Sequence, residues 1–238
     1  MIDCFGIDVS IDEIRRWSEL TAGPTGFGSE GWALQPYDPS SSRWPAAADH
    51  FFEHFFPIPC PDLPQASVME LGCGPGYNAG VLLPFIREFI GVDISVFCVA
   101  LSKYRFARLD SASFHHTVYD VDLIVEKANT VDVVFGKYFF IHQPQERIRP
   151  MLEFSHRMLR PGGRIIIDRQ TERFPWHIEN DGEWVPGSDW WGFTIDRDWL
   201  VGQLREVGFD SIEIAPSGIY VKSVDRDDVI ENIIARRA

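Results

Sequence analysis

The segment from residue 67 to residue 85 constrains the fold of this 238-residue chain more than any other part. It begins with an apolar run, Ser67–Leu71, continues through the turn GCGPG at 72–76, and ends in a helical pattern, Tyr77–Phe85. A strand that enters a glycine-rich turn and leaves as a helix is typical of the first unit of a doubly wound sheet, with a ligand site at the carboxyl end of the strand. Pro84 lies within the helical pattern and is expected to shorten that helix.

Strand-like and helix-like patterns continue to alternate after this unit. The further strand patterns are Arg87–Val92, Ser113–Val118, Val131–Phe135, Arg164–Ile167, Ser211–Ala215 and Gly218–Val224. The helical patterns between them are Val96–Ala107, Pro144–Leu159 and Asp198–Val207. Such alternation predicts an α/β fold with a doubly wound, mostly parallel, seven-stranded sheet. Only Pro216 and Ser217 separate the last two strand patterns, so we expect a hairpin that supplies an antiparallel last strand.

The length of the chain favours a single domain, residues 1–238, rather than two independent cores. Residues 1–65 form an N-terminal cap with helical patterns at Ile11–Leu20 and Ala46–Phe56. Residues 66–168 form the core of the sheet, and 169–195 form a polar, aromatic insertion after the fifth strand. Residues 196–238 complete the sheet and end in a terminal helix.

The net charge of the chain disfavours a nucleic-acid partner. Asp and Glu number 35 against 22 Lys and Arg, which gives a net charge of −13. Binding to a nucleic-acid backbone depends on a basic face, so we expect no nucleic-acid partner. No apolar run reaches the ~18 residues of a membrane span, and the N-terminus lacks the basic and apolar stretches of a signal peptide. We therefore expect no membrane partner and a cytoplasmic location.

The cysteines do not form a metal-binding pattern. Cys4, Cys60, Cys73 and Cys98 are far apart, without a CxxC pair or a histidine at metal-ligand spacing. We therefore expect reduced thiols and no metal site.

Two glycine-rich stretches approach a nucleotide-binding pattern, and their context separates them. GFGSEG at 26–31 matches GxGxxG by letter, but no strand pattern precedes it and Pro36 limits any helix after it, so we interpret it as a loop. GCGPG at 72–76 has both the strand and the helix. However, Tyr77 stands where the dinucleotide fingerprint needs its third glycine, and Glu70 would repel a pyrophosphate. The turn therefore favours a ligand that carries a cation and a ribose.

Asp93 closes the second strand pattern, 17 residues after Gly76. An acid at the tip of this strand can accept hydrogen bonds from the two hydroxyls of a ribose. The alternative is a cap for the helix Val96–Ala107, but Ser95 can serve that purpose. We therefore favour the ribose-binding role.

Together these motifs resemble those of the class I S-adenosylmethionine-dependent methyltransferases, and particularly the small-molecule enzymes of that family. ELGCGPG at 70–76 resembles the first motif, GVDIS at 91–95 the second-strand acid, and YDVDL at 119–123 the third-strand acid. VDVVFG at 131–136 resembles the fourth strand, and MLRPGGRIIID at 158–168 the turn into the fifth. The resemblance covers residues 66–168 by motif and 196–224 by pattern only. It implies a Rossmann-like fold, methyl transfer and S-adenosyl-L-methionine as the cofactor.

The resemblance also implies roles for individual residues. Glu70 and the backbone of the glycine turn would hold the methionine end of the cofactor, and Asp93 its ribose. Asp120 would lie by the adenine amino group, with Asp122 as an alternative, and Gly136 would face the sulfonium. The implied cofactor-binding residues are Glu70, Gly72, Cys73, Gly74, Gly76, Asp93, Ile94, Asp120, Val121 and Gly136.

The segment after the fourth strand bears on the acceptor. Enzymes that methylate base amino groups carry an Asn/Asp-Pro-Pro-Tyr motif there, and those that methylate pyrimidine carbons carry a Pro-Cys. This chain has GKYF at 136–139, and its Pro59-Cys60 lies before the first motif. With the acidic charge, this predicts a small-molecule acceptor, with O- or N-methylation favoured over C-methylation.

Three side chains are candidates for catalysis. His142 is the first candidate for a general base, because a neutral imidazole titrates near working pH. The alternative is that His142 caps or packs the start of the helix Pro144–Leu159. His177 is the second candidate, and Tyr138 is a third that would orient the acceptor.

The insertion and the activity both leave alternatives open. The insertion holds four of the eight tryptophans, which would either enclose a flat or apolar acceptor or bury the insertion's own core or a homodimer interface. Other functions that stay open are a non-catalytic cofactor-binding partner subunit and another adenosyl-sulfonium enzyme, such as an aminopropyl transferase. An NAD-dependent oxidoreductase is disfavoured by Tyr77.

Overall fold

The fold is described from a computed structural model. It describes residues 2–4, 7–9, 11–22, 35–41, 48, 51–52, 63–116, 121–171, 193–217 and 230–238. Within these ranges, no helix has the length and apolar character needed to cross a membrane.

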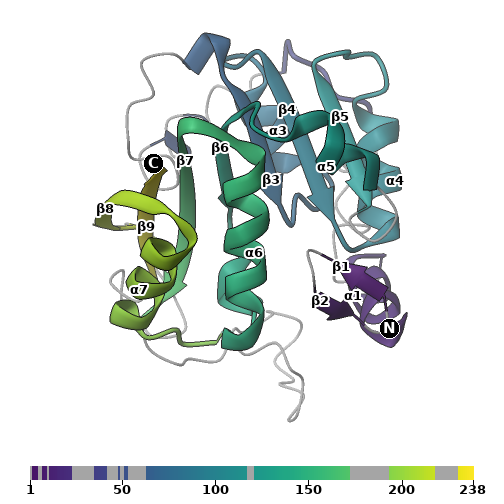
Figure 1. The fold of residues 1–238 in the computed structure, drawn as a ribbon. Coiled ribbons are helices and arrows are strands. Elements are labelled where there is room, and N and C mark those ends of the chain that lie inside the picture. The colour runs from purple at the N-terminus through teal and green to yellow at the C-terminus, as the bar shows by residue number, and fades with distance from the viewer. Residues whose placement is uncertain are drawn as a thin grey trace.

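A seven-stranded sheet in the order β5-β4-β3-β6-β7-β9-β8 forms the centre of the fold (Figure 1). The strands are β3 Ser67–Leu71, β4 Glu88–Asp93, β5 Ala112–His116, β6 Val131–Gly136, β7 Leu159–Gln170, β8 Phe209–Pro216 and β9 Ile230–Arg237. Neighbouring strands from β5 to β7 are parallel, whereas β9 is antiparallel to both β7 and β8. The predicted doubly wound sheet with an antiparallel last strand is therefore confirmed.

Helices cover both faces of the sheet. They are α3 Tyr77–Leu82, α4 Val96–Arg105, α5 Val121–Lys127, α6 Gln145–Met158 and α7 Arg197–Val207, with short 3-10 turns η2 Leu63–Gln65 and η3 Phe140–His142. Side chains of α3 and α4 share one buried cluster with Val68, Phe89 and Val133. Side chains of α5, α6 and α7 share the other with Met69 and Val134. The central strands β3, β4 and β6 are buried on both faces, which explains why they read as nearly continuous apolar runs.

The N-terminal elements pack beside the sheet. A small hairpin, β1 Ile2–Cys4 and β2 Ile7–Val9, which the sequence did not predict, precedes the predicted helix, α1 Ile11–Ala22. Figure 1 shows these elements together below α4, which α1 contacts. Of the second predicted helix, Ala46–Phe56, only three residues are described, and they are helical.

The structure corrects the C-terminal part of the prediction. The expected terminal helix is wrong, because Ile230–Arg237 forms β9, in which Ile230, Ile233 and Ala235 are fully buried. The antiparallel partner of β8 is thus β9, while the predicted strand Gly218–Val224 lies outside the described residues. Helix α5 was also not predicted. As expected from Pro84, α3 ends early, at Leu82.

Candidate functional site

The strand order has a topological switch point at the carboxyl ends of β3 and β6. From β3 the chain proceeds outward to β4 and β5, and then crosses to β6 on the other side of β3. In open α/β sheets such a topological switch point is where ligands bind. The predicted site residues follow β3, β4 and β6, so the topology brings them to one rim.

The turn after β3 depends on glycine for two reasons. Gly72, Gly74 and Gly76 have φ values of +71°, +51° and +78°, a left-handed backbone that other residues rarely adopt. A Cβ on Gly72 would lie 2.6 Å from Cδ2 of Phe139, and one on Gly76 would lie 2.7 Å from Cε2 of Phe106. These glycines are therefore required because the aromatic rings of Phe139 and Phe106 pack against them. They also leave room for a ligand to approach the backbone.

Asp93 ties the end of β4 to the glycine turn. Its Oδ2 accepts the N–H of Gly74 at 2.8 Å, and its Oδ1 accepts the N–H of Ser95 at 2.7 Å. Burial raises the pKa of Asp93, while these two N–H donors favour the ionised form. Ser95 caps α4 by accepting the N–H of Cys98, as the sequence indicated. Each carboxylate oxygen of Asp93 retains a lone pair for a further donor such as a ribose hydroxyl.

Glu70 is a buried carboxyl with an unused oxygen. The residue is 1% exposed, and Nδ2 of Asn78 donates to its Oε1 at 2.5 Å. Its Oε2 has no hydrogen-bond partner among the described residues. Burial raises the pKa of Glu70 to about 8, against the opposing effects of Asn78 and Lys137. A buried acceptor without a donor indicates a missing partner, and a cationic donor would suit this one best.

The segment after β6 is packed closely. A Cβ on Gly136 would lie 2.9 Å from Cβ of Phe139 and 3.0 Å from Cε2 of Phe140, so aromatic rings adjoin this glycine. Tyr138 has a φ of +52°, which is unusual outside glycine. Burial raises the pKa of Tyr138 to about 12, so its hydroxyl stays protonated near neutral pH and is able to donate a hydrogen bond.

His142 ends the short turn η3, immediately before α6. Burial lowers the pKa of its imidazole to about 4. Such an imidazole is neutral at pH 7, but it has little affinity for a proton taken from an acceptor. The environment of His142 therefore favours the alternative in which it packs at the start of the helix.

Two further ionisable side chains, which the sequence analysis did not select, lie at the same rim. Asp168, near the end of β7, is 5% exposed; its Oδ1 accepts the N–H of Phe140 at 3.1 Å, and its Oδ2 has no hydrogen-bond partner among the described residues. Burial raises the pKa of Asp168 to about 7. Burial also lowers the pKa of Lys137, which follows β6, to about 8. The rule that selected Asp93, an acid that closes an apolar strand, would also have selected Asp168.

The remaining predicted cofactor residues are only partly described. Asp120 and His177 lie outside the described residues, as does the side chain of Val121, which begins α5. Asp122 is exposed in the first turn of α5. Cys73 is buried at the turn, and the carbonyl of Ile94 accepts a hydrogen bond from Nε2 of His116 at 2.8 Å.

Both described ends of the insertion meet this rim. The N–H of Phe193 donates to the carbonyl of Ile141 in η3 at 2.6 Å. Thr194 forms a bridge with Gln170 at the end of β7. The insertion thus leaves and re-enters the fold beside the segment that carries Lys137, Tyr138 and His142, while residues 172–192 lie outside the description.

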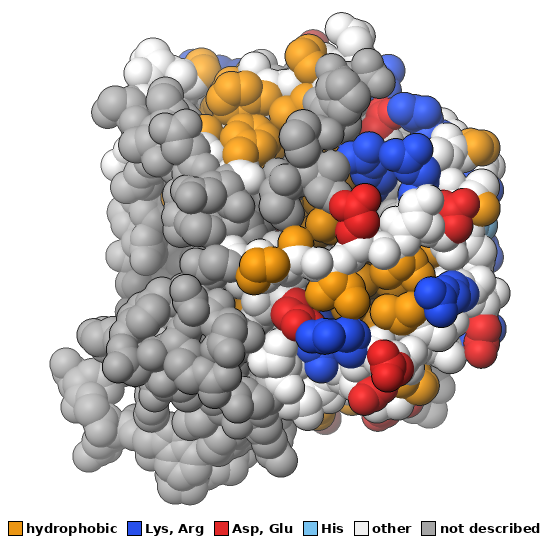
Figure 2. Space-filling view, turned by 90° about the vertical axis from the view of Figure 1, so that its left-hand side faces the viewer, with side chains coloured by type: hydrophobic (Ala, Val, Ile, Leu, Met, Phe, Trp, Pro, Cys, Tyr) orange, Lys and Arg blue, Asp and Glu red, His pale blue; other side chains and the backbone are white. Residues whose placement is uncertain are grey.

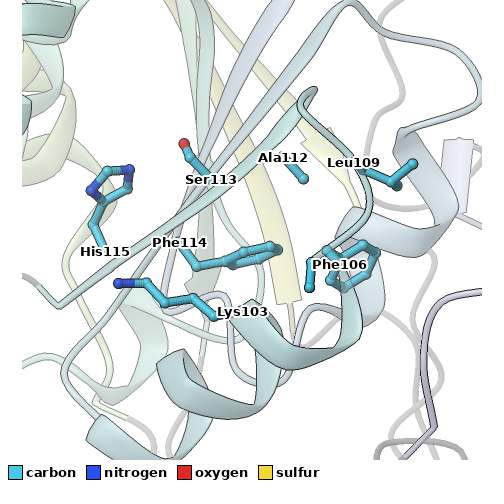
Figure 3. Close-up of a pocket in the computed structure, with 8 residues that line it drawn as sticks. Lys103, Phe106, Leu109, Ala112, Ser113, Phe114 and His115 are labelled. Carbon is cyan, nitrogen blue, oxygen red and sulfur yellow. The ribbon is translucent and has the colours of Figure 1, made fainter.

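An open pocket of about 320 Å³ lies elsewhere, at the edge of the sheet (Figure 3). It is lined by the end of α4 and by β5, and the rings of Phe106 and Phe114 face each other there with centroids 5.2 Å apart. None of the predicted site residues lines it. The rim beyond β3 and β6 therefore stays the candidate site.

Comparisons with known proteins relate this chain to methyltransferases. Residues 68–163 match a family described as a methyltransferase domain. An arsenite methyltransferase of Halobacterium salinarum is 26% identical over 64% of this chain and 39% of its own length. A probable thiol methyltransferase of Arabidopsis thaliana is 29% identical over 49% of this chain and 54% of its own length. The chain thus spans about half or less of these curated relatives.

A solved structure extends the likeness in fold to nearly the whole chain. A phosphoethanolamine N-methyltransferase of Haemonchus contortus in complex with S-adenosyl-L-methionine superposes with a TM-score of 0.61 at 15% identity. The superposition covers 98% of this chain and 61% of that one. At this identity the likeness concerns the fold.

Proposed function

We propose that this chain, whose residues 68–163 match a family described as a methyltransferase domain, is a class I enzyme that transfers a methyl group from S-adenosylmethionine to a small-molecule acceptor. The observation that carries the proposal is the unused Oε2 of buried Glu70 beside the left-handed glycine turn. A dinucleotide would bring a pyrophosphate to this carboxyl, whereas the cofactor of this family brings an ammonium group.

The residues at the rim fit the cofactor. Glu70 would accept a hydrogen bond from the ammonium of the methionine end, and Asp93 would use its remaining lone pairs for the ribose hydroxyls. The proposed adenine contacts are Ile94, Val121 and Asp120 or Asp122, and Gly136 would face the sulfonium. When bound, the cofactor supplies an electrophilic methyl group. The protein's own part is to hold the acceptor in line with that group and to keep water out.

The acceptor is proposed to be a small molecule whose reactive atom is oxygen, nitrogen, sulfur or, as in arsenite, arsenic. The notable excess of acidic residues supports this choice over a nucleic acid. On the face in Figure 2, Lys and Arg side chains alternate with Asp and Glu among the described residues. The names of the two curated relatives make arsenite and thiols useful first acceptors, alongside phenols and amines.

The proposal is tested by incubation of the protein with methyl-labelled S-adenosylmethionine and a panel of arsenite, thiols, phenols and amines. Label should pass to one chemical class of acceptor, and S-adenosylhomocysteine should accumulate in equal amount. Glu70→Gln, which keeps the hydrogen bond from Asn78, should lower the affinity for the cofactor and leave the fold intact. Label transfer to double-stranded DNA or structured RNA alone would contradict the small-molecule assignment.

A further inference from the structure

Three ionisable side chains lie in a row at the carboxyl rim of the sheet. Glu70 comes from β3, Lys137 directly follows β6, and Asp168 comes from β7. These strands are adjacent in the order β3-β6-β7, and Ile167 is in register with Gly136, the residue before Lys137. A cation therefore lies between two carboxyl groups at the topological switch point, where the strand order predicts the ligand.

The row also lies on one face of the sheet. The cluster beneath α3 and α4 includes the residue two positions before each of the three groups. These residues are Val68 before Glu70, Phe135 before Lys137 and Ile166 before Asp168. Residues two apart on a strand share a face, which places Glu70 and Asp168 on that face. Lys137 follows the end of β6, but its Nζ reaches the ring of Phe51, a member of the same cluster. Nζ of Lys137 lies 6.0 Å from the ring centroid of Phe51 and 5.4 Å from that of Tyr138.

Each carboxyl group of the row has one oxygen that protein donors leave unused. Among the described residues, neither Oε2 of Glu70 nor Oδ2 of Asp168 has a hydrogen-bond partner, and both atoms are buried. The other oxygen of each is occupied, by Asn78 and by the N–H of Phe140. The family role of Glu70 accounts for the first unused oxygen, but nothing in that role accounts for Lys137 or Asp168.

We propose that Lys137 is the base that takes the proton of the methyl acceptor, and that Asp168 is a positioning residue that holds Lys137 and its loop. This inference rests on the proposed function. In the reaction, a lone pair of the acceptor forms the new bond to the methyl carbon, the S–CH3 bond breaks with its electron pair on sulfur, and the acceptor's proton passes to Nζ of Lys137. The positive charge lost at sulfur thus reappears on Lys137, between two carboxyl groups.

The titration of Lys137 agrees with this role. Its pKa of about 8 reflects burial, which disfavours the ammonium, against Glu70 and Asp168, which favour it. A cationic sulfonium nearby would disfavour the ammonium further, so a larger fraction of the amine is neutral when the cofactor is bound than after transfer. Nζ of Lys137 also lies close to Tyr138, whose hydroxyl stays protonated near neutral pH.

The geometry of Asp168 supports a positioning role. Besides the N–H of Phe140, the backbone N–H groups of Tyr138 and Ile141 favour its ionised form. These donors belong to the segment that carries Lys137. Its carboxylate thus fixes the loop and stabilises the ammonium form of the neighbouring side chain.

The experiment that tests this inference measures the pKa of each lysine. The rate of trace acetylation by acetic anhydride is followed as a function of pH, and mass spectrometry reads the acetylation at each lysine. The chain has four lysines, Lys103, Lys127, Lys137 and Lys222, so the sites are easily resolved. Lys103, exposed on α4, is the internal reference. The titration is performed without ligand, with S-adenosylmethionine and with the neutral thioether S-adenosylhomocysteine.

Lys137 should titrate below the ordinary lysine pKa of 10.5, and S-adenosylmethionine should lower its pKa by about one pH unit relative to S-adenosylhomocysteine. Asp168→Asn, which keeps an oxygen for the N–H of Phe140, should lower the pKa of Lys137 in the unliganded protein. If both ligands bind and Lys137 titrates alike with each, Lys137 is not beside the sulfonium and the inference is wrong. If neither ligand binds, the proposed function itself fails.

Turnover supplies the second readout, with the acceptor found in the labelling panel. Lys137→Met should lower kcat by about 10²–10⁴ at a pH where the acceptor is protonated, and the loss should shrink as the pH rises through the acceptor's own pKa. Cofactor affinity and the thermal midpoint should change little. A folded variant that binds the cofactor and keeps wild-type turnover at all pH values would remove Lys137 from the mechanism.

Discussion

The buried carboxyl of Glu70 should make the unliganded protein less stable as the pH rises, and Glu70→Gln should remove this effect. The ordinary pKa of 4.5 is raised by burial to about 8 in the folded protein. The unfolded chain therefore releases this proton at lower pH than the folded chain, and stability is lost as pH rises from about 4.5 to 8. Each pH unit in this range lowers the free energy of unfolding by about 1.4 kcal/mol. Because Glu70 is already partly ionised in the folded protein at pH 8, its total effect between pH 6 and pH 8 is a loss of about 2 kcal/mol.

A glutamine at position 70 keeps an oxygen for Nδ2 of Asn78 but carries no ionisable group. Between pH 6 and pH 8, the free energy of unfolding of the wild type should fall by about 2 kcal/mol more than that of Glu70→Gln. In thermal unfolding, this difference corresponds to about 4–8 °C in the midpoint. Urea unfolding at both pH values measures this. Glu153→Gln, which removes a charge at an exposed position of α6, is the control. An equal pH dependence in wild type and Glu70→Gln would refute the reasoning.

Three further predictions concern the turn, the helix start and the surface. Gly76→Ala should lower the free energy of unfolding by about 2–4 kcal/mol in urea, because of its left-handed backbone and the ring of Phe106, whereas Gly202→Ala, with open space in α7, should be neutral or stabilising. His142→Ala should lower the thermal midpoint and leave kcat per folded molecule near wild type; a loss of 10²–10⁴ in kcat without a change in cofactor affinity would instead make it the base. In mobility-shift series near physiological ionic strength, the protein should not be retained on duplex DNA, and tight, salt-sensitive retention would overturn the small-molecule assignment.

Local patterns were sufficient to predict the part of the site that lies close together in sequence. The glycine turn, the strand before it and Asp93 belong to one βαβ unit, whose apolar runs and turn residues identify it directly. The structure adds the reason for each glycine, since the rings of Phe139 and Phe106 come from distant segments. Contacts between segments that are far apart in the sequence cannot be predicted from the residues around each glycine.

The last strand, the Lys137–Asp168 juxtaposition and the low pKa of His142 depend on strand order and burial, which local sequence patterns do not reveal. Ile230–Arg237 inserts between β7 and β8, and nothing in its own sequence specifies that place. Lys137 and Asp168 come to the same rim only because β6 and β7 are neighbours, and the lowered pKa of His142 arises from burial. A search for acids and bases at every strand end, followed by a test of which ends adjoin, would have found the pair.

Calorimetric titration with S-adenosylmethionine, S-adenosylhomocysteine and NAD tests most directly the claim that the rim beyond β3 and β4 is a cofactor site. The first two should bind with micromolar affinity and NAD should give no binding heat under the same conditions. Asp93→Ala should weaken both adenosyl ligands, because it removes the acceptor for the ribose and the anchor of Gly74. Preferential binding of NAD, or unchanged affinity in a folded Asp93→Ala variant, would contradict the assignment.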